Sequence, residues 1–257
     1  MSTPTASDWT TALHASHDRL VGLVASLDEV ALTSPSYDSD WSIGQVLSHL
    51  GSQAEIFDLF VAAVEAGEPV PGSDVVPPIW DRWNAKSALE WRDDFVAADT
   101  TALAGIEALD PDTFRIAMFG MDLDLVGFVR TRLQEHAIHT WDVAVALDPA
   151  ALVSLDAVAL LIDGIGVTAA RAGKGSPAPY RVRIGTSDPS RDLVVSVSDA
   201  VTIDAAEPDD SYDGSIDLPA EAFLRLVTGR LDPDHAPAWT ESGARGLTDL
   251  RTAFPGF

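Results

Sequence analysis

The chain has 257 residues, no cysteine, and 40 acidic against 16 basic side chains, which gives a formal net charge of −24. So large a negative charge repels phosphate backbones and anionic lipid surfaces, which argues against nucleic-acid and membrane partners. Without cysteine the protein offers neither a disulfide nor a thiolate of its own. A metal ion would therefore have to be held by histidine and carboxylate side chains.

The start of the chain lacks the basic residues and apolar core of a secretory signal. No apolar run reaches the roughly 18 residues that a membrane-spanning helix needs. We therefore predict a cytoplasmic protein, present as a monomer or a small homo-oligomer. Abundant alanine, valine and aspartate, with lysine only at positions 86 and 174, indicate a bacterial source.

Four amphipathic helices are predicted in residues 1–150, because apolar side chains recur there at helical spacing. They cover approximately residues 8–27, 43–67, 88–109 and 125–147. Two of the starts carry capping boxes, Ser42 with Gln45 and Ser87 with Glu90. The Pro-rich segment 68–78 is expected to be a surface loop or a lid, not a helix. These elements predict an N-terminal four-helix up-and-down bundle.

Residues 151–257 follow a different pattern. A fifth helix is predicted at 155–172, and then alternating apolar residues indicate strands at 180–184, 193–197, 201–203 and 215–218. Short helices are expected at 220–228 and 246–254. The second half is therefore predicted to be a small α+β domain, so that the fold class is a helical bundle followed by an α+β domain.

The fourth predicted helix places Glu135, His139 and Asp142 on one face, at spacings of four and three residues. A carboxylate and an imidazole one turn apart can hold a divalent metal from one side. The best third ligand is His49, on the flank of the apolar face of the second helix, although taken alone it is more simply a packing residue. We therefore predict Zn²⁺ or another divalent ion on His49, Glu135 and His139, with a fourth position open.

Other histidines and one carboxylate leave alternatives. His136 points closer to the centre of the apolar face than Glu135 and is an alternative ligand to His139. Asp142 is suited equally to orienting a ligating histidine and to a hydrogen bond between packed helices. His14 and His17 on the first helix are expected to be solvated or at the edge of the bundle.

Three motifs, in this order, resemble the mycothiol-dependent maleylpyruvate isomerase family over nearly the whole chain. They are Trp41-Ser-Ile-Gly-Gln-Val-Leu-Ser-His49-Leu50, Glu135-His-Ala-Ile-His139-Thr-Trp-Asp142 and Leu226-Val-Thr-Gly-Arg230-Leu231. The resemblance implies a DinB-type bundle and a C-terminal domain similar to sterol-carrier folds. It also implies zinc on the three predicted ligands and mycothiol as the thiol cosubstrate. His136 departs from the family pattern, in which an apolar residue is commoner.

This resemblance predicts a metal-dependent, mycothiol-using isomerase or thiol S-transferase that acts on a small electrophile similar to maleylpyruvate. A protein without cysteine needs an external thiol for such chemistry, and a metal lowers the pKa of that thiol. Arg230 is implied as a catalytic residue that binds a substrate carboxylate, although alone it is simply an arginine at a helix C-terminus. The alternatives are mycothiol conjugation of xenobiotics, or a non-catalytic small-molecule or metal-binding protein on the same fold.

Overall fold

The computed structural model describes residues 3–38, 40–118, 120–207 and 210–256. The chain divides into two compact units, Met1–Leu152 and Val153–Phe257. The predicted fold class, a helical region followed by a smaller unit built on a sheet, is confirmed. Because the two units are not placed relative to one another, each is described by itself.

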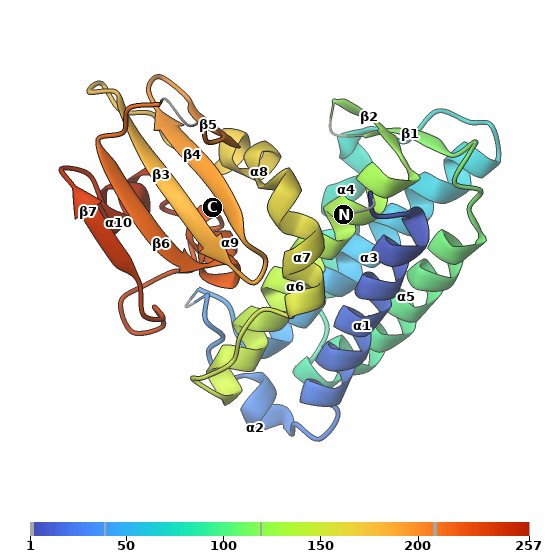
Figure 1. The fold of residues 1–257 in the computed structure, drawn as a ribbon. Helices are drawn as coiled ribbons and strands as arrows, with labels where there is room; N and C mark the ends of the chain where they lie inside the picture. Colours follow the sequence, from blue (N-terminus) through green and yellow to red (C-terminus); the bar gives the residue numbers. More distant parts are fainter. Residues whose placement is uncertain (1–2, 39, 119, 208–209, 257) are drawn as a thin grey trace. The chain divides into compact units, whose positions relative to one another are not determined.

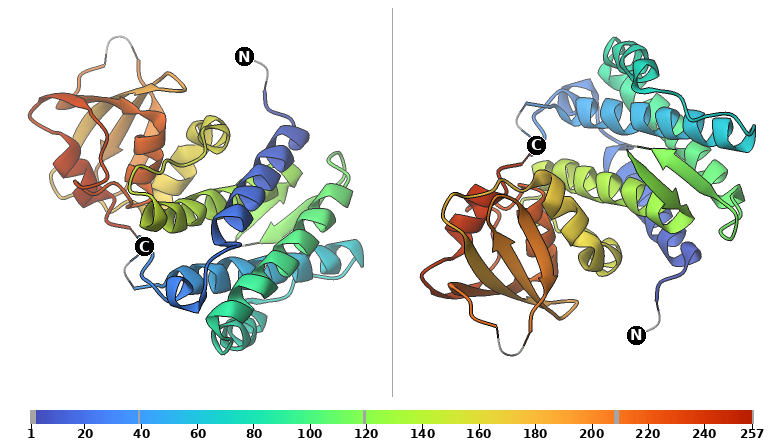
Figure 2. Two further views of the ribbon diagram at one scale, coloured as in Figure 1. Left: turned by 90° about the horizontal axis from the view of Figure 1, so that it is seen from below. Right: turned by 90° about the horizontal axis from the view of Figure 1, so that it is seen from above.

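Four long helices form the first unit, and they lie alongside one another in Figures 1 and 2. They are α1 (Ala6–Val24), α3 (Ile43–Glu65), α5 (Ala88–Ala108) and α6 (Leu125–Leu147), with the short α2 (Glu29–Leu32) between the first two. Helix α1 packs on α6, and α3 packs on both α5 and α6. Their facing apolar side chains are buried, which supplies most of the driving force for this arrangement.

The predicted capping boxes at the starts of α3 and α5 are confirmed. The hydroxyl of Ser42 accepts from the backbone of Gln45, whose side chain accepts from the backbone of Ser42 at 2.8 Å. Ser87 and Glu90 make the same reciprocal pair at the start of α5. Because each box fixes where its helix begins, it also fixes which residues face the core.

The short elements of the first unit, α2 included, were not predicted. The segment expected to be free of helix contains a 3₁₀ turn, η1 (Ser73–Val75), and the start of α4 (Val76–Asn84). That prediction was wrong because Pro77 and Pro78 lie in the first turn of α4, where a backbone N–H has no partner in the helix to lose. A hairpin of β1 (Arg115–Met118) and β2 (Met121–Asp124) precedes α6.

The second unit begins with helices and ends with a sheet. The predicted helix at 155–172 is broken into α7 (Leu155–Leu161), the 3₁₀ turn η2 (Ile162–Gly164) and α8 (Ile165–Ala172). The sheet has the order β5-β4-β3-β6-β7, in which only β3 and β6 run parallel. Its strands are β3 (Tyr180–Ser187), β4 (Arg191–Val197), β5 (Val201–Ala205), β6 (Gly214–Pro219) and β7 (Thr240–Gly243); helices α9 (Ala220–Val227) and α10 (Leu247–Ala253) complete the unit.

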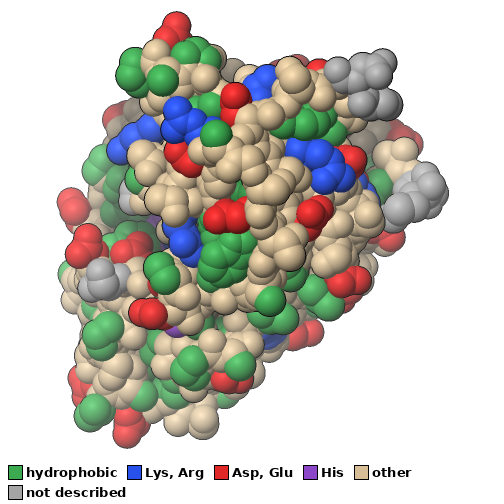
Figure 3. Space-filling model, turned by 60° about the vertical axis from the view of Figure 1, so that its left-hand side comes forward, with side chains coloured by type: hydrophobic (Ala, Val, Ile, Leu, Met, Phe, Trp, Pro, Cys, Tyr) green, Lys and Arg blue, Asp and Glu red, His purple; other side chains and the backbone are tan. Residues whose placement is uncertain are grey.

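The surface carries charged side chains of both signs. On the face drawn in Figure 3, the basic side chains of the described residues are interspersed with acidic and hydrophobic ones. Among the helices that the structure describes, none is long and apolar enough to cross a membrane.

Helix α4 is held against α3 by close contact at a glycine. A Cβ atom on Gly51 would overlap the six-membered ring of Trp83, which is 2% exposed and donates from Nε1 to Glu55 Oε2 at 2.9 Å. The indole ring thus lies directly on the backbone of α3. Only glycine at position 51 permits this approach.

We expect Gly51→Ala to lower the free energy of unfolding by about 1–3 kcal/mol, because the buried ring has to shift. Gly22→Ala is the matched control, since a Cβ there meets nothing within 4 Å. The control should gain up to about 1 kcal/mol from helix propensity. Urea denaturation of both variants measures the difference, and equal stabilities would contradict the packing described for Trp83.

Candidate metal centre

Three of the predicted site residues meet where α3 faces α6. His49 comes from α3, and Glu135 and His139 come from successive turns of α6. His49 Nε2 lies 3.4 Å from Glu135 Oε2, and His139 Nε2 lies 3.8 Å from the same oxygen. One ligand atom from each residue lies within 4.8 Å of the other two. We call these three residues the His49 cluster.

The spacing within the His49 cluster suits a metal ion. Tetrahedral zinc with bonds of about 2.0–2.1 Å to nitrogen and oxygen separates its ligand atoms by about 3.3–3.4 Å. The separations of 3.4 and 3.8 Å around Glu135 Oε2 are close to that value. The donor set of two imidazole nitrogens and one carboxylate oxygen also fits zinc and related divalent ions.

Asp142 fixes the ring of His139. Its Oδ2 lies 2.8 Å from His139 Nδ1, and its side chain is fully buried. Because a carboxylate accepts, Nδ1 carries the proton and the lone pair lies on Nε2, the nitrogen that faces Glu135. Of the two roles considered for Asp142, the geometry is that of a residue that orients the histidine.

Trp41 packs against both imidazoles of the His49 cluster. Its ring lies 5.0 Å from that of His49 and 5.9 Å from that of His139, with the second pair nearly parallel. The carbonyl of Trp41 accepts from the backbone and the hydroxyl of Ser36, each at 2.9 Å. The bend that precedes α3 therefore holds an apolar wall beside the two rings.

The electrostatics leave the carboxylate charged and the histidine on α3 neutral. Burial acts to raise the pKa of Glu135, but the hydrogen bond with His49 and the nearby imidazoles lower it to about 2. Burial lowers the pKa of His49 below 6.5, and the hydrogen bond with Glu135 opposes this only in part. At neutral pH the cluster thus presents an anionic oxygen beside an unprotonated imidazole, as a metal requires.

The cluster is accessible to solvent from one side. The side chains of His49 and Glu135 are 25% and 36% exposed, whereas His139 is buried. An ion held by these three residues would keep a position open for an exogenous ligand. That arrangement is typical of catalytic metal sites, because structural sites are closed by four protein ligands.

The structure places His136 in a second group, away from the His49 cluster. Its Nε2 lies 3.1 Å from Asp99 Oδ2, and its Nδ1 lies 2.9 Å from the hydroxyl of Ser16. His17 Nδ1 reaches the same oxygen of Asp99 at 2.7 Å. His136 therefore does not join His49 as an alternative ligand, because its two nitrogens are engaged by Ser16 and Asp99 instead.

We call His17, Asp99 and His136 the Asp99 cluster. The expectation that His17 is solvated or at an edge was wrong, because the imidazole is buried on Asp99. Arg132 Nη2 donates to Asp99 Oδ1 at 2.5 Å and to the carbonyl of Leu50 at 3.0 Å. Burial acts to raise the pKa of Asp99, but Arg132 and then His136 hold it well below its ordinary value.

The two clusters differ in what balances the carboxylate. In the Asp99 cluster a guanidinium already neutralises the charge, and the imidazoles contact the carboxylate at hydrogen-bond distances of 2.7 and 3.1 Å. In the His49 cluster the two imidazole nitrogens lie farther from the carboxylate oxygen, at 3.4 and 3.8 Å, as they would around an ion. The His49 cluster is therefore the candidate metal centre.

Arg230 lies in the second unit, just beyond the end of α9. Its Nη1 donates to the carbonyl of Thr228 at 2.8 Å, and its backbone N–H donates to the carbonyl of Arg225 at 2.7 Å. Arg225 is buried and pairs with Glu221 through two bonds of 2.6 and 2.9 Å. The turn that carries Arg230 is thus anchored on a buried ion pair, and its catalytic role stays a prediction.

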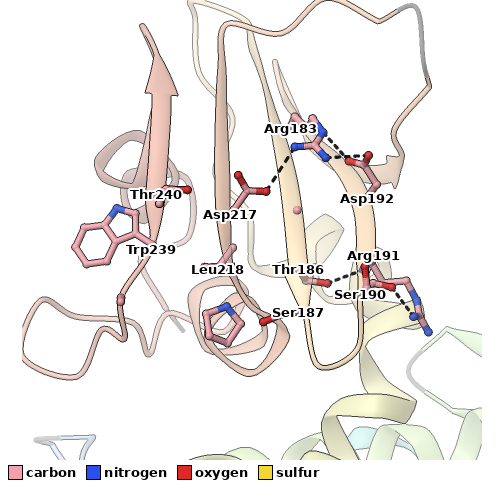
Figure 4. Close-up of a pocket in the computed structure, with 13 residues that line it drawn as sticks. Arg183, Thr186, Ser187, Ser190, Arg191, Asp192, Asp217, Leu218, Trp239 and Thr240 are labelled. Atoms are coloured by element: carbon pink, nitrogen blue, oxygen red, sulfur yellow. Dashed lines mark hydrogen bonds and ion pairs between the residues drawn. The ribbon is translucent and has the colours of Figure 1, made fainter.

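The second unit also carries an open hollow of about 580 Å³ on the sheet (Figure 4). Arg183 projects over it between Asp192 and Asp217, and Arg191 binds Asp163. Because these arginines are already paired with carboxylates, the hollow is poorly suited to binding an anionic ligand. It gives no chemistry comparable to that of the His49 cluster.

Sequence reasoning did not identify Gln53, which contacts Glu135, nor Arg132 and Asp99, which lie behind it in the bundle. A signal was present for Arg132, since it lies on the apolar face of α6 together with Val129 and His136. A charged residue in such a stripe needs a buried partner of opposite charge. The partner, Asp99, lies 33 residues away on α5, and no local pattern indicates it.

The fold and site define a helical-bundle protein with an appended α+β unit and a cluster of two histidines and one glutamate. Residues 13–144 match the family model described as the mycothiol maleylpyruvate isomerase N-terminal domain. The chain therefore belongs to the mycothiol maleylpyruvate isomerase family, as the resemblance of its motifs predicted.

Solved structures show the same fold over nearly the whole chain. The crystal structure of the mycothiol-dependent maleylpyruvate isomerase aligns with a TM-score of 0.69 and 13% identity, over 96% of this chain and 98% of that one. The crystal structure of a histidine-to-alanine mutant aligns with the same TM-score and coverage at 12% identity. A comparison with curated protein sequences found no match.

We expect Asp99→Asn to lower the free energy of unfolding by about 3–5 kcal/mol at pH 7, because Arg132 loses its buried counter-charge. The lowered pKa of Asp99 lies below the unfolded value of about 3.9. The stability that ionised Asp99 contributes to the folded state is therefore complete well above pH 4. It is lost as the pH falls through the pKa that Asp99 has in the folded protein. Guanidinium denaturation at pH 7 and pH 3 should show a smaller difference between wild type and variant at pH 3.

The control for this prediction is Asp58→Asn on α3, because burial raises the pKa of that carboxyl instead. Removing its charge should leave stability at pH 7 unchanged or slightly higher. A loss at Asp58 similar to that at Asp99 would contradict the special role assigned to the pair with Arg132.

Proposed function

We propose that this protein is a metal-dependent enzyme that uses mycothiol to isomerise a small electrophile of the maleylpyruvate type. The observation that carries the proposal is the meeting of His49 Nε2, His139 Nε2 and Glu135 Oε2 at one partly exposed point. Membership of the family supplies the thiol and the class of reaction. The proposed partners are therefore a small-molecule substrate and mycothiol.

We propose that His49, Glu135 and His139 hold Zn²⁺ or another divalent ion. Such an ion, when bound, would lower the pKa of a thiol so that the nucleophilic form is present near neutral pH. The remaining tasks belong to the chain itself. Asp142 keeps the lone pair of His139 on the ligating nitrogen, and Trp41 keeps water from one side of the rings.

The proposed reaction has a balanced course. The sulfur of the thiolate forms a bond to one carbon of the cis double bond, and the π electron pair of the double bond moves onto the conjugated carbonyl oxygen, which becomes an enolate. Rotation follows about the resulting single bond. The electron pair of the enolate then returns as the carbon–sulfur bond breaks, which gives the trans double bond and releases the thiolate. Arg230 is proposed to bind a substrate carboxylate through its planar fork during these steps.

The first test is metal content. We expect purified wild type to hold about one divalent ion per chain and His49→Ala to hold almost none, because two protein ligands bind zinc weakly. His235→Ala is the matched control, since His235 is 26% exposed and pairs with Asp232 at 3.0 Å in the second unit. Elemental mass spectrometry measures all three. Undiminished metal in His49→Ala would overturn the proposed site.

The second test is turnover. With mycothiol present we expect maleylpyruvate to be converted to fumarylpyruvate, and Arg230→Lys to lower kcat/KM about 10–100-fold, because an ammonium cannot replace a two-point contact. Metal content should not change. Arg183→Lys, an arginine of the same unit paired with Asp192, should behave as wild type.

The same assay separates the proposal from its alternatives. Conjugation of mycothiol to chlorobimane without turnover of maleylpyruvate would identify a thiol S-transferase instead. Stabilisation by ligands without any turnover would identify a non-catalytic binding protein. Either result would replace isomerisation as the function.

A further inference from the structure

A continuous series of contacts joins the candidate metal centre to the buried interior of the bundle. Gln53, on α3, lies between Glu135 and Arg132: its Nε2 is 3.4 Å from Glu135 Oε2, and its Oε1 accepts from Arg132 Nη1. Arg132 in turn donates to Asp99 Oδ1 and to the carbonyl of Leu50. Three helices thus contribute to one polar network that ends on a proposed ligand.

The orientation of the Gln53 amide is dictated by its neighbour. A guanidinium has only donors, so the amide oxygen must face Arg132. The amide NH₂ is then forced toward Glu135, where it donates to Oε2. That oxygen is the one that faces both imidazoles, so the hydrogen bond from Gln53 and the proposed metal act on the same atom.

Arg132 is itself immobilised. Its side chain is 2% exposed and is bound by Asp99 from α5 and by the backbone of Leu50 from α3. Asp99 receives two further hydrogen bonds, one from His17 and one from His136. A guanidinium held at this many points cannot turn away from Gln53 without breaking buried charge-assisted bonds.

We propose that Gln53 is a positioning residue for the metal centre: it holds Glu135 Oε2 toward His49 and His139 through an amide whose orientation Arg132 and Asp99 fix. The inference rests on the proposed metal site and adds residues outside its ligand set. It explains why a buried ion pair lies next to a solvent-accessible cluster. Without Gln53 the carboxylate of Glu135 would be held before a metal binds by His49 but no longer by an amide of fixed orientation.

The test is the affinity of the metal-free full-length protein for zinc alone, measured by competition with a chromophoric chelator. We expect Gln53→Leu, which has no amide, to bind zinc about 10–100-fold more weakly than wild type, as is usual when a residue behind a ligand is lost. Gln53→Asn keeps the amide but is one methylene shorter, so it cannot span Arg132 and Glu135. Gln53→Asn should lose a similar amount of zinc affinity. With this second variant, the test does not depend on correct folding of Gln53→Leu.

Glu55→Gln is the matched control, because Glu55 lies two residues away on α3 but binds Arg82 and Trp83 instead. Its zinc affinity should equal that of wild type. Cobalt absorption spectra supply a second readout, since a displaced Glu135 changes the coordination geometry. If Gln53 served only the stability of the fold, its variants would change the unfolding of the metal-free protein. They would change neither its zinc affinity nor its cobalt spectrum.

The outcomes separate this inference from the proposed function. If wild type and both Gln53 variants bind zinc equally tightly with the same cobalt spectrum, the positioning role is overturned and the metal site stands. If Glu55→Gln loses as much affinity as the Gln53 variants, the effect is general to α3 and the inference is also overturned. If wild type binds no divalent metal, both the proposed function and the inference fail.

Discussion

The buried ion pair between Asp99 and Arg132 is the constraint on which the centre of the bundle depends. It joins α5 to α6, and through the carbonyl of Leu50 it also binds α3. Removing two charges from water is costly, and the direct bond offsets that cost together with the hydrogen bonds that Asp99 accepts from His17 and His136 and those that Arg132 donates to Leu50 and Gln53. Because these bonds are directional, they fix the rotation of each helix about its own axis more narrowly than apolar packing alone. The same rotation brings Glu135 and His139 to face α3.

The periodicity of α6 distributes its polar residues between two environments. His136 contacts Ser16 on α1 and Asp99 on α5, whereas Glu135 and His139, one turn apart, point toward His49 on α3. Arg132, one turn before His136, pairs with Asp99 and also contacts the backbone of α3. The first group, Arg132 and His136 with Asp99, is enclosed, and its ion pair is neutral. The second is partly exposed and contains an ionised carboxylate beside a neutral imidazole, an environment in which a divalent cation supplies the missing positive charge. The difference in burial therefore makes the Asp99 cluster part of the core and leaves the His49 cluster as the candidate site.

Much of this arrangement could be predicted from the sequence because its determinants are local. The capping box at Ser42 fixes the start of α3, and hence where His49 lies on it, and the four-residue spacing of Glu135 and His139 fixes their shared face. The start of α4 could not be predicted by treating prolines as helix breakers, since Pro77 and Pro78 occupy the one turn that tolerates them. The burial of His17 and His136 depends on Asp99, a residue distant in the sequence. Tertiary packing brings Asp99 next to these histidines, and the apolar periodicity of the helices does not indicate such a contact.

Substitutions in the His49 cluster and at Arg132 should differ in their effects on the fold and on the candidate site. A substitution at His49 or Glu135 alters a partly exposed group and leaves the Asp99 cluster intact, so the fold can retain its core while the site is modified. A substitution at Arg132 leaves Asp99 as a buried charge without its counter-charge. The same substitution also releases Gln53 from its fixed orientation. Stability and site geometry are therefore coupled at Arg132 and separable at the ligands themselves. The proposed ligands can therefore be substituted with less effect on the fold than the buried pair behind them.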